Sequence, residues 1–213
     1  MIWNATEGSK ATRPRLWIRR DSRRLAALTV LCLLVLVGCS SNTGQPSPAG
    51  SPTVSTSLRF GAPEIVAPRD LRMRAADPCS SLLTPSQLRS LGYLDPGVKQ
   101  VLLGSVPSCL WKSSKPSRRL RVAVWTTRNY FIDVYRSRLL PVFRPTEVAG
   151  LPAVEQQNDV DSSNCATAVG VAEVQTLDVT IDVEKLANGA LSAQPCLEGR
   201  RAIEAVVSTL PPL

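Results

Sequence analysis

The sequence predicts an α+β domain, in which an antiparallel sheet of about five strands carries three helices, mainly on one face, and two disulfides. Three observations predict this fold. Residues 177–183 alternate apolar and polar side chains, as in a strand of a sheet with one solvated face. Residues 84–92, 129–140 and 195–210 show helical spacing with recognisable helix ends. Four cysteines are distributed through this part of the chain: Cys79, Cys109, Cys165 and Cys196.

Residues 1–38 contain the features of an export signal in the expected order. We therefore do not count them as part of the folded domain. Seven basic residues up to Arg24 precede an apolar run, residues 25–37, which ends in Leu36-Val37-Gly38-Cys39. This run would span about 20 Å as a helix, short of the roughly 30 Å hydrocarbon core, so a transmembrane helix is the weaker interpretation. Small residues before a cysteine resemble a bacterial lipobox, in which the Cys39 thiol accepts the lipid. We expect a lipoprotein on the outer face of the cytoplasmic membrane.

Residues 39–57 are expected to be a disordered tether between the lipid and the domain. Ser40 to Ser57 contain six Ser, three Thr, three Pro and two Gly, and no charged residue. Such a composition buries too little apolar surface to offset the entropy of ordering, and its root-mean-square reach is about 25 Å. The folded domain is expected to occupy residues 58–213, with residues 58–76 as an extended arm.

The elements of the domain follow in order. Thr84-Pro85-Ser86-Gln87 has the pattern of a capping box, and Gly92 ends the helix that it starts. Residues 109–111 and 119–126 are expected to be strands, followed by a helix over 129–140. Residues 151–157 should form an edge strand, because Pro152 cannot donate a hydrogen bond to a neighbouring strand. Strands over 165–171 and 177–183 precede the last helix, which starts near Pro195.

The four cysteines of the domain predict two disulfides, because an even number is typical of an exported domain. Of the three connectivities, we favour Cys79–Cys109 and Cys165–Cys196, since each pair links a strand to the start of a helix through the shortest loops. A zinc site is a weaker alternative: the chain has no histidine and no CxxC spacing.

The order of several short motifs resembles a group of actinobacterial secreted lipoproteins defined by a domain of unknown function. The motifs are Asp77-Pro78-Cys79, the helix start at 82–88, Cys109-x-Trp111, Gly150-Leu-Pro-Ala153, Cys165, and Cys196 followed by Leu210-Pro211. The resemblance covers about residues 60–213. It implies a compact α+β domain with two disulfides outside the membrane, and it implies no catalytic residues.

No motif of a known catalytic site is present in the sequence, so we predict no catalytic residue, metal site or cofactor. The absence of histidine excludes Ser-His and Cys-His nucleophiles. Asp159-Val-Asp161 begins like a calcium loop but lacks the later Gly and Glu, so a solvated turn is the better interpretation. Asp178 and Asp182 share one strand face and leave a carboxylate enzyme open as the alternative.

Charge is divided unevenly along the domain. Residues 59–144 contain 15 basic and five acidic residues, whereas residues 145–213 contain three basic and ten acidic residues. Export makes nucleic acid an unlikely partner of the basic segment, so anionic lipid or an acidic envelope protein is the candidate. The contact residues that we expect are Arg118, Arg119, Arg121, Arg128, Arg136 and Arg138. The competing interpretation is that the two halves neutralise each other.

Three hypotheses about the function therefore remain open. The first is a non-catalytic module that binds a ligand or a partner protein in the cell envelope. The second is an enzyme that acts on envelope polymers through Asp159, Asp161, Asp178 or Asp182. The third is a structural or sensory accessory of a neighbouring membrane protein.

Overall fold

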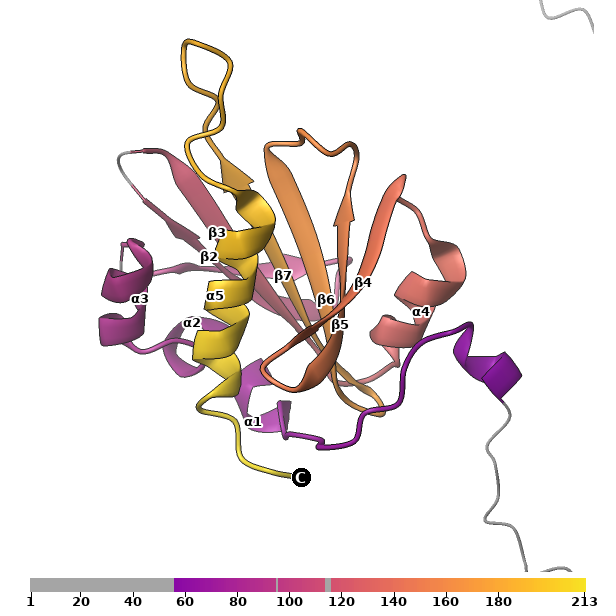
Figure 1. The fold of residues 1–213 in the computed structure, drawn as a ribbon. Helices are drawn as coiled ribbons and strands as arrows, with labels where there is room; N and C mark the ends of the chain where they lie inside the picture. Colours follow the sequence, from indigo (N-terminus) through magenta and orange to yellow (C-terminus); the bar gives the residue numbers. More distant parts are fainter. Residues whose placement is uncertain (1–55, 95, 114–115) are drawn as a thin grey trace, which may run out of the picture. The chain divides into compact units, whose positions relative to one another are not determined.

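The computed structural model describes residues 56–94, 96–113 and 116–213. The predicted signal peptide, Cys39 and the tether up to residue 55 lie outside the described residues. The described part of the chain contains seven strands, five α-helices and a short 3₁₀ helix, η1 (Thr56–Arg59) (Figure 1). None of these helices is both long enough and apolar enough to cross a lipid bilayer.

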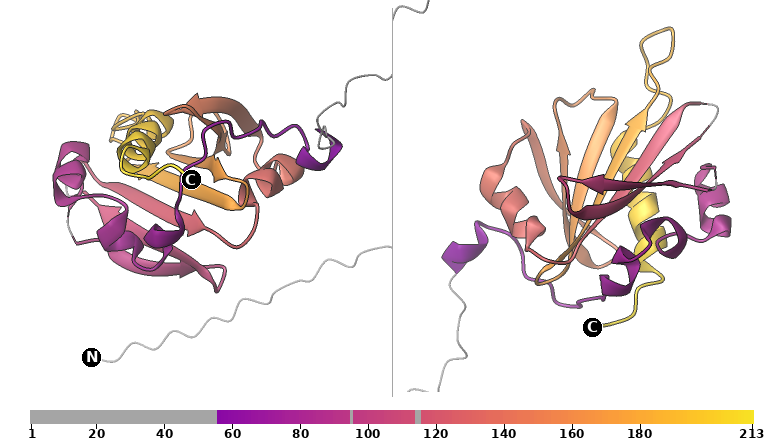
Figure 2. Two further views of the ribbon diagram at one scale, coloured as in Figure 1. Left: turned by 90° about the horizontal axis from the view of Figure 1, so that it is seen from below. Right: turned by 180° about the vertical axis from the view of Figure 1, so that it is seen from behind.

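The seven strands form one antiparallel sheet in the order β1-β2-β3-β7-β6-β5-β4 (Figure 1). The strands are β1 (Val98–Leu102), β2 (Val106–Lys112), β3 (Arg118–Trp125), β4 (Val142–Val148), β5 (Leu151–Gln157), β6 (Asn164–Ala172) and β7 (Gln175–Val183). The sheet thus joins two meanders, β1–β3 and β4–β7, through the pairing of β3 with β7. The connection from β3 to β4 carries helix α4 (Tyr130–Ser137) along one face of the sheet, as the view from behind shows (Figure 2).

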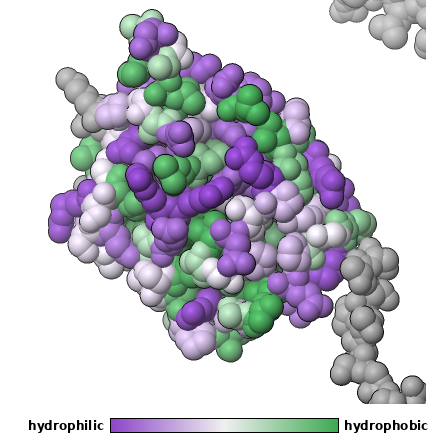
Figure 3. Space-filling model, in the orientation of Figure 1, coloured by the Kyte–Doolittle hydropathy of each residue, from purple (hydrophilic) through white to green (hydrophobic). Residues whose placement is uncertain are grey.

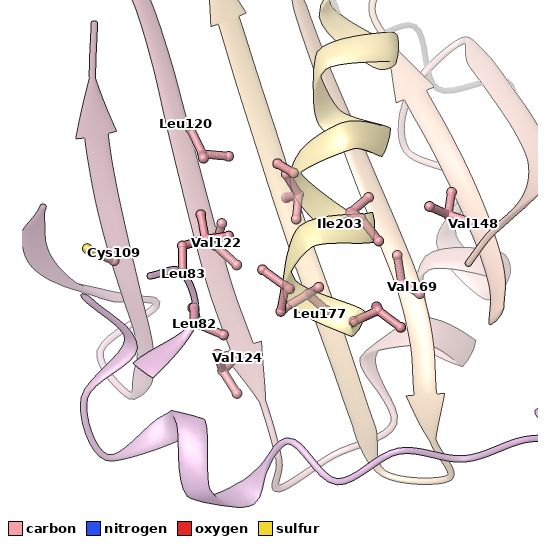
Figure 4. Close-up of a cluster of buried hydrophobic side chains, with 14 of the residues drawn as sticks. Leu82, Leu83, Cys109, Leu120, Val122, Val124, Val148, Val169, Leu177 and Ile203 are labelled. Carbon is pink, nitrogen blue, oxygen red and sulfur yellow. The ribbon is translucent and has the colours of Figure 1, made fainter. Parts of the chain in front are cut away.

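The main core lies between the sheet and helix α5 (Pro195–Val207). The alternation predicted for residues 177–183 is real: Leu177, Val179 and Ile181 are fully buried and face this helix. They belong to one buried cluster with Ile203 of α5, and Figure 4 shows Leu177 and Ile203 between the helix and the sheet. The face of the sheet that α5 covers is closed to solvent, and burying each such side chain stabilises the fold by about 1.5–3 kcal/mol.

Three short helices complete the same layer beside α5. They are α1 (Arg72–Ala75), α2 (Pro78–Ser81) and α3 (Pro85–Leu91). The capping box predicted at the start of α3 is present: the Thr84 side chain accepts from the Gln87 N–H, and the Gln87 side chain accepts from the Thr84 N–H. Gly92 ends this helix in the left-handed conformation, as expected.

The second face of the sheet is covered only in part. Helix α4 packs Phe131, Val134 and Tyr135 against Val154 of β5 and Ala168 of β6. The rest of this face, over β2, β3 and β7, combines polar and charged side chains with a small buried cluster of Val106, Ala123 and Trp125. The face that carries α5 also shows many hydrophilic residues at its surface (Figure 3).

The α+β class and both disulfides are confirmed, but the predicted numbers of strands and helices were too low. Strands β1 and β4 were not predicted, because as edge strands they bury few of their side chains fully and show no clear alternation. Helices α1 and α2 have four residues each, too few for a periodic pattern, and the predicted extended arm of residues 58–76 contains α1 and part of η1.

The prediction that residues 151–157 form an edge strand is wrong. Strand β5 pairs with β4 on one side and β6 on the other, and β4 is the edge. Pro152 is tolerated because the ladder between β5 and β6 begins at Ala153, one residue later. The edge strand β4 itself contains a proline, Pro145.

Candidate functional site

The candidate site is the part of the sheet that no helix covers, which we call the open face. The strand registers place its side chains in rows across β2, β3, β7 and β6. One row contains Leu110, Arg121, Thr180 and Ala166. The next contains Ser108, Ala123 and Asp178 and continues to Ala168, which lies beneath α4. Asp178 is therefore the one acidic side chain in a row of small residues. Asp178 itself is half-buried, between the buried side chains of its cross-strand neighbours Ala123 and Ala168.

Asp178 lies between a cation and an aromatic N–H. Arg121 and Trp125 flank its partner Ala123 on β3, so both are diagonal neighbours of Asp178 on the same face. Burial raises the pKa of the Asp178 carboxyl from 3.8 to about 6, while the Arg121 guanidinium and the Trp125 indole N–H oppose this rise. The group can therefore exist as an acid or as a carboxylate near neutral pH.

An aromatic stack borders Asp178 where α4 begins. The rings of Trp125 and Tyr130 are parallel within 9°, with centroids 4.0 Å apart, and the Arg128 guanidinium lies 4.6 Å from the Trp125 ring centroid. Burial raises the pKa of the Tyr130 hydroxyl to about 12, and the charge of Asp178 adds to this effect. The stack is thus a rigid apolar wall beside a titratable carboxyl group.

The second predicted carboxylate of this strand has a different environment. Asp182 forms an ion pair of 3.4 Å with Arg119, directly opposite on β3, and both side chains are largely solvated. Asp178 and Asp182 are four residues apart in one strand, so their Cα atoms are separated by about 13 Å. The open face therefore holds one desolvated carboxyl group and one surface ion pair.

The structure does not bring the six predicted arginines together. Arg118 points to the opposite side of the sheet, where it donates to Glu198 of α5 at 2.7 Å and lies over the ring of Tyr93. Arg119 and Arg121 lie on the open face. The other three, Arg128, Arg136 and Arg138, surround α4, where Asp133 pairs with Arg136 at 2.7 Å and Arg128 at 3.5 Å.

A buried acidic residue that the sequence did not reveal lies on the α5 side of the sheet. Glu155 of β5 is fully buried and accepts a 2.6 Å hydrogen bond from the Arg200 Nε on α5, while Arg144 of β4 lies 3.5 Å from its other oxygen. The sequence predicts residues 151–157 as an edge strand, and nothing in its pattern marks this glutamate as buried. The side chains that lie against it, Arg200 and Arg144, come from α5 and β4.

A cavity of about 430 Å³ lies near this cluster, at the start of α5. Arg144, Gln157, Asp161 and the first residues of α5 line it. The predicted turn at Asp159 is present: its carboxylate accepts a hydrogen bond from the Asp161 backbone N–H at 2.9 Å. Neither of these two aspartates lies on the open face with Asp178, so the four carboxylates considered for an enzyme do not form one cluster.

The four cysteines are joined as Cys79–Cys109 and Cys165–Cys196, the favoured connectivity. The first disulfide links α2 to β2, and the second links the first turn of α5 to β6. All four thiols are consumed in these bonds, which excludes the zinc site considered as the alternative. In the residues that the structure describes, no group of three acidic, cysteine or histidine side chains is arranged to hold a metal.

Comparison with known proteins assigns the chain to a family without a known activity. The chain belongs to the family described as protein of unknown function (DUF3558), whose model matches residues 34–209. No curated protein and no solved structure matches the chain.

Proposed function

We propose that this member of the DUF3558 family is an exported lipoprotein, anchored through Cys39, whose domain binds a polar ligand or partner protein on its open face. Two findings support export. The family match starts at residue 34 and so includes the Gly38–Cys39 junction of the predicted lipobox. The domain also contains two disulfides, which persist in oxidising compartments.

The observation that carries the binding role is the environment of Asp178. A carboxyl group whose pKa is raised to about 6 by burial destabilises a fold at neutral pH, and such groups concentrate at functional sites. Here the group is flanked by alanines, a guanidinium and an aromatic stack. This arrangement offers an acceptor, a donor and an apolar wall to one polar molecule, which is the chemistry of a binding site.

An enzyme acting on envelope polymers is the second candidate, because Asp178 could exchange a proton near neutral pH. Hydrolysis of a glycosidic bond usually needs a second carboxylate within about 5–10 Å. The other acid on this strand face, Asp182, is about 13 Å away along the strand and paired with Arg119. The geometry therefore favours binding over hydrolysis.

Site-specific photo-crosslinking in cells tests the binding role. A photoreactive amino acid at Thr180, beside Asp178 on the open face, should form a defined adduct with the partner. The same amino acid at Glu204, exposed on α5, is the matched control and should not. Asp178→Asn and Arg121→Gln should each reduce the Thr180 adduct.

Two outcomes would contradict the proposal. Identical adducts at Thr180 and Glu204, or no adduct at Thr180, would argue against the open face as a binding surface. Release of fragments from purified cell wall by the natural protein, lost in Asp178→Asn, would instead establish the enzyme.

A further inference from the structure

We propose that a second surface, formed by η1, the residue after it, and α4 with the residues that flank it, rests directly on the anionic membrane and fixes the orientation of the domain. We call it the membrane-facing patch, and it consists of Leu58, Phe60, Arg128, Arg136, Arg138 and Leu139. The inference rests on the proposed lipid anchor but not on the open-face site. It names the membrane lipid, rather than a protein, as the contact of this patch.

The position of the chain's entrance into the domain is the first argument. The described residues begin at Thr56 in η1, and η1 contacts α4 (Figure 1). The contact is well defined: Ala62 is buried in the cluster of Phe131 and Val134, and the Arg136 guanidinium lies 5.8 Å from the Phe60 ring centroid. An anchor at residue 39 would therefore be connected to the domain on its α4 side.

The length of chain before η1 limits how far this side can be from the lipid. Seventeen peptide units separate Cys39 from Thr56. Such a segment spans at most about 60 Å when fully extended and has a root-mean-square reach of about 25 Å. The α4 side is consequently the part of the domain with the highest local concentration of membrane.

Charge is the second argument. Asp133 is the acidic residue among the patch arginines, and it is shared between Arg128 and Arg136. Arg138 forms no ion pair with any described residue, and its guanidinium lies 4.9 Å from the Phe143 ring centroid. Three arginines against one aspartate leave a local charge of +2, which an anionic lipid surface attracts.

Exposed apolar side chains are the third argument. Leu139 is 81% exposed, Leu58 is 69% exposed and Phe60 is 44% exposed. Leu139 also lines, with Arg128 and Arg136, a cavity of about 260 Å³ on α4. Large apolar residues set among arginines are typical of surfaces that insert shallowly between anionic headgroups. A contact with an acidic protein would explain the arginines but would not explain why the patch adjoins the tether.

Hydrogen–deuterium exchange of the full chain on vesicles tests this inference. The lipidated protein is placed in vesicles of phosphatidylcholine, with or without phosphatidylglycerol, and its intact mass reports the lipid on Cys39. Exchange of peptides covering 56–62 and 130–140 should be slower on the phosphatidylglycerol vesicles. High salt should remove this difference, because surface charges are then screened.

Variants sharpen the test. Arg136→Gln with Arg138→Gln should abolish the protection, since each arginine is expected to change the ratio of docked to undocked domain about 5-fold. Leu58→Ser with Leu139→Ser should weaken it even at low salt. Arg119→Gln with Arg121→Gln removes the same charge from the open face and is the matched control, which should keep the protection.

The two proposals fail in distinguishable ways. A mass without lipid on Cys39 would refute the anchor. Lipidated protein with equal exchange of both peptides on the two kinds of vesicle would overturn the membrane-facing patch alone. Protection lost in the Arg119 and Arg121 variant, but kept in the Arg136 and Arg138 variant, would also overturn it.

Discussion

At the scale of single residues, Asp178 couples the open face to pH. Its carboxyl group has a pKa of about 6 in the folded protein, against 3.8 as its ordinary value. Between these values the folded state binds more protons than the unfolded state. The free energy of unfolding should therefore fall as the pH rises from about 4 to about 6, and the loss should persist above that range.

Asp178→Asn, which cannot ionise, should thus be more stable than the natural protein at about pH 8, by about 1–3 kcal/mol. The difference should disappear at about pH 4, where the natural carboxyl group is protonated in the folded state. Urea unfolding at both pH values measures it. Asp182→Asn, four residues along the same face, is the control and should change stability by less than about 1 kcal/mol. A pH-independent effect of Asp178→Asn would contradict this account.

Glu155 is the second residue whose role depends on its surroundings. Arg200→Met should destabilise the domain by about 2–4 kcal/mol, because it leaves a fully buried carboxylate with only Arg144 at 3.5 Å. Adding Glu155→Leu should restore part of this loss, since the unpaired charge is then removed. Urea unfolding of the single and double variants gives the coupling. Additive losses in the double variant would show that the two residues do not depend on each other.

At the scale of elements, the two disulfides support helices of very different length. Helix α2 has four residues and cannot form alone, whereas α5 has 13 residues and buries Ala202, Ile203 and Val206 in the core. The first disulfide therefore holds a helix in place, and the second attaches one that already packs well.

Removing either disulfide should lower stability by about 3.5 kcal/mol in the chain-entropy model. The local effects should differ. The double variant Cys79→Ala with Cys109→Ala should speed hydrogen exchange in residues 72–83, whereas Cys165→Ala with Cys196→Ala should leave exchange in residues 199–207 nearly unchanged. Equal local loosening in both variants would show that α5 also depends on its disulfide.

At the scale of the whole molecule, the uneven charge along the sequence is partly neutralised by folding. Among the residues that the structure describes, three ion pairs join the basic segment to the acidic one: Arg118–Glu198, Arg119–Asp182 and Arg144–Glu155. Arg118 and Arg119 are therefore paired with acidic residues and are not free surface cations. The positive charge that remains around α4 after folding belongs to the membrane-facing patch, where it could attract anionic lipid.

The proposed anchor is tested on the whole chain. Cys39→Ser should move the protein out of the membrane fraction and abolish lipid labelling, because the thiol is the proposed attachment atom. Cys32→Ser, within the apolar run, is the matched control and should behave like the natural protein. Unchanged membrane retention and labelling of the Cys39 variant would refute lipidation at this residue.

Features that depend on local chemistry could be predicted from the sequence. Capping at Thr84, the alternation of residues 177–183 and the helix beginning at Pro195 follow from neighbours a few residues apart, and the disulfide pairing followed from which helix starts adjoin which strands. Contacts between side chains that are distant in the sequence became visible in the folded domain. Edge strands β1 and β4, the burial of Glu155 and the separation of Arg118 from Arg121 all depend on strand order, which local patterns do not encode. The raised pKa of Asp178 has the same origin, since it arises from burial of the carboxyl group, which the packing of neighbouring strands produces.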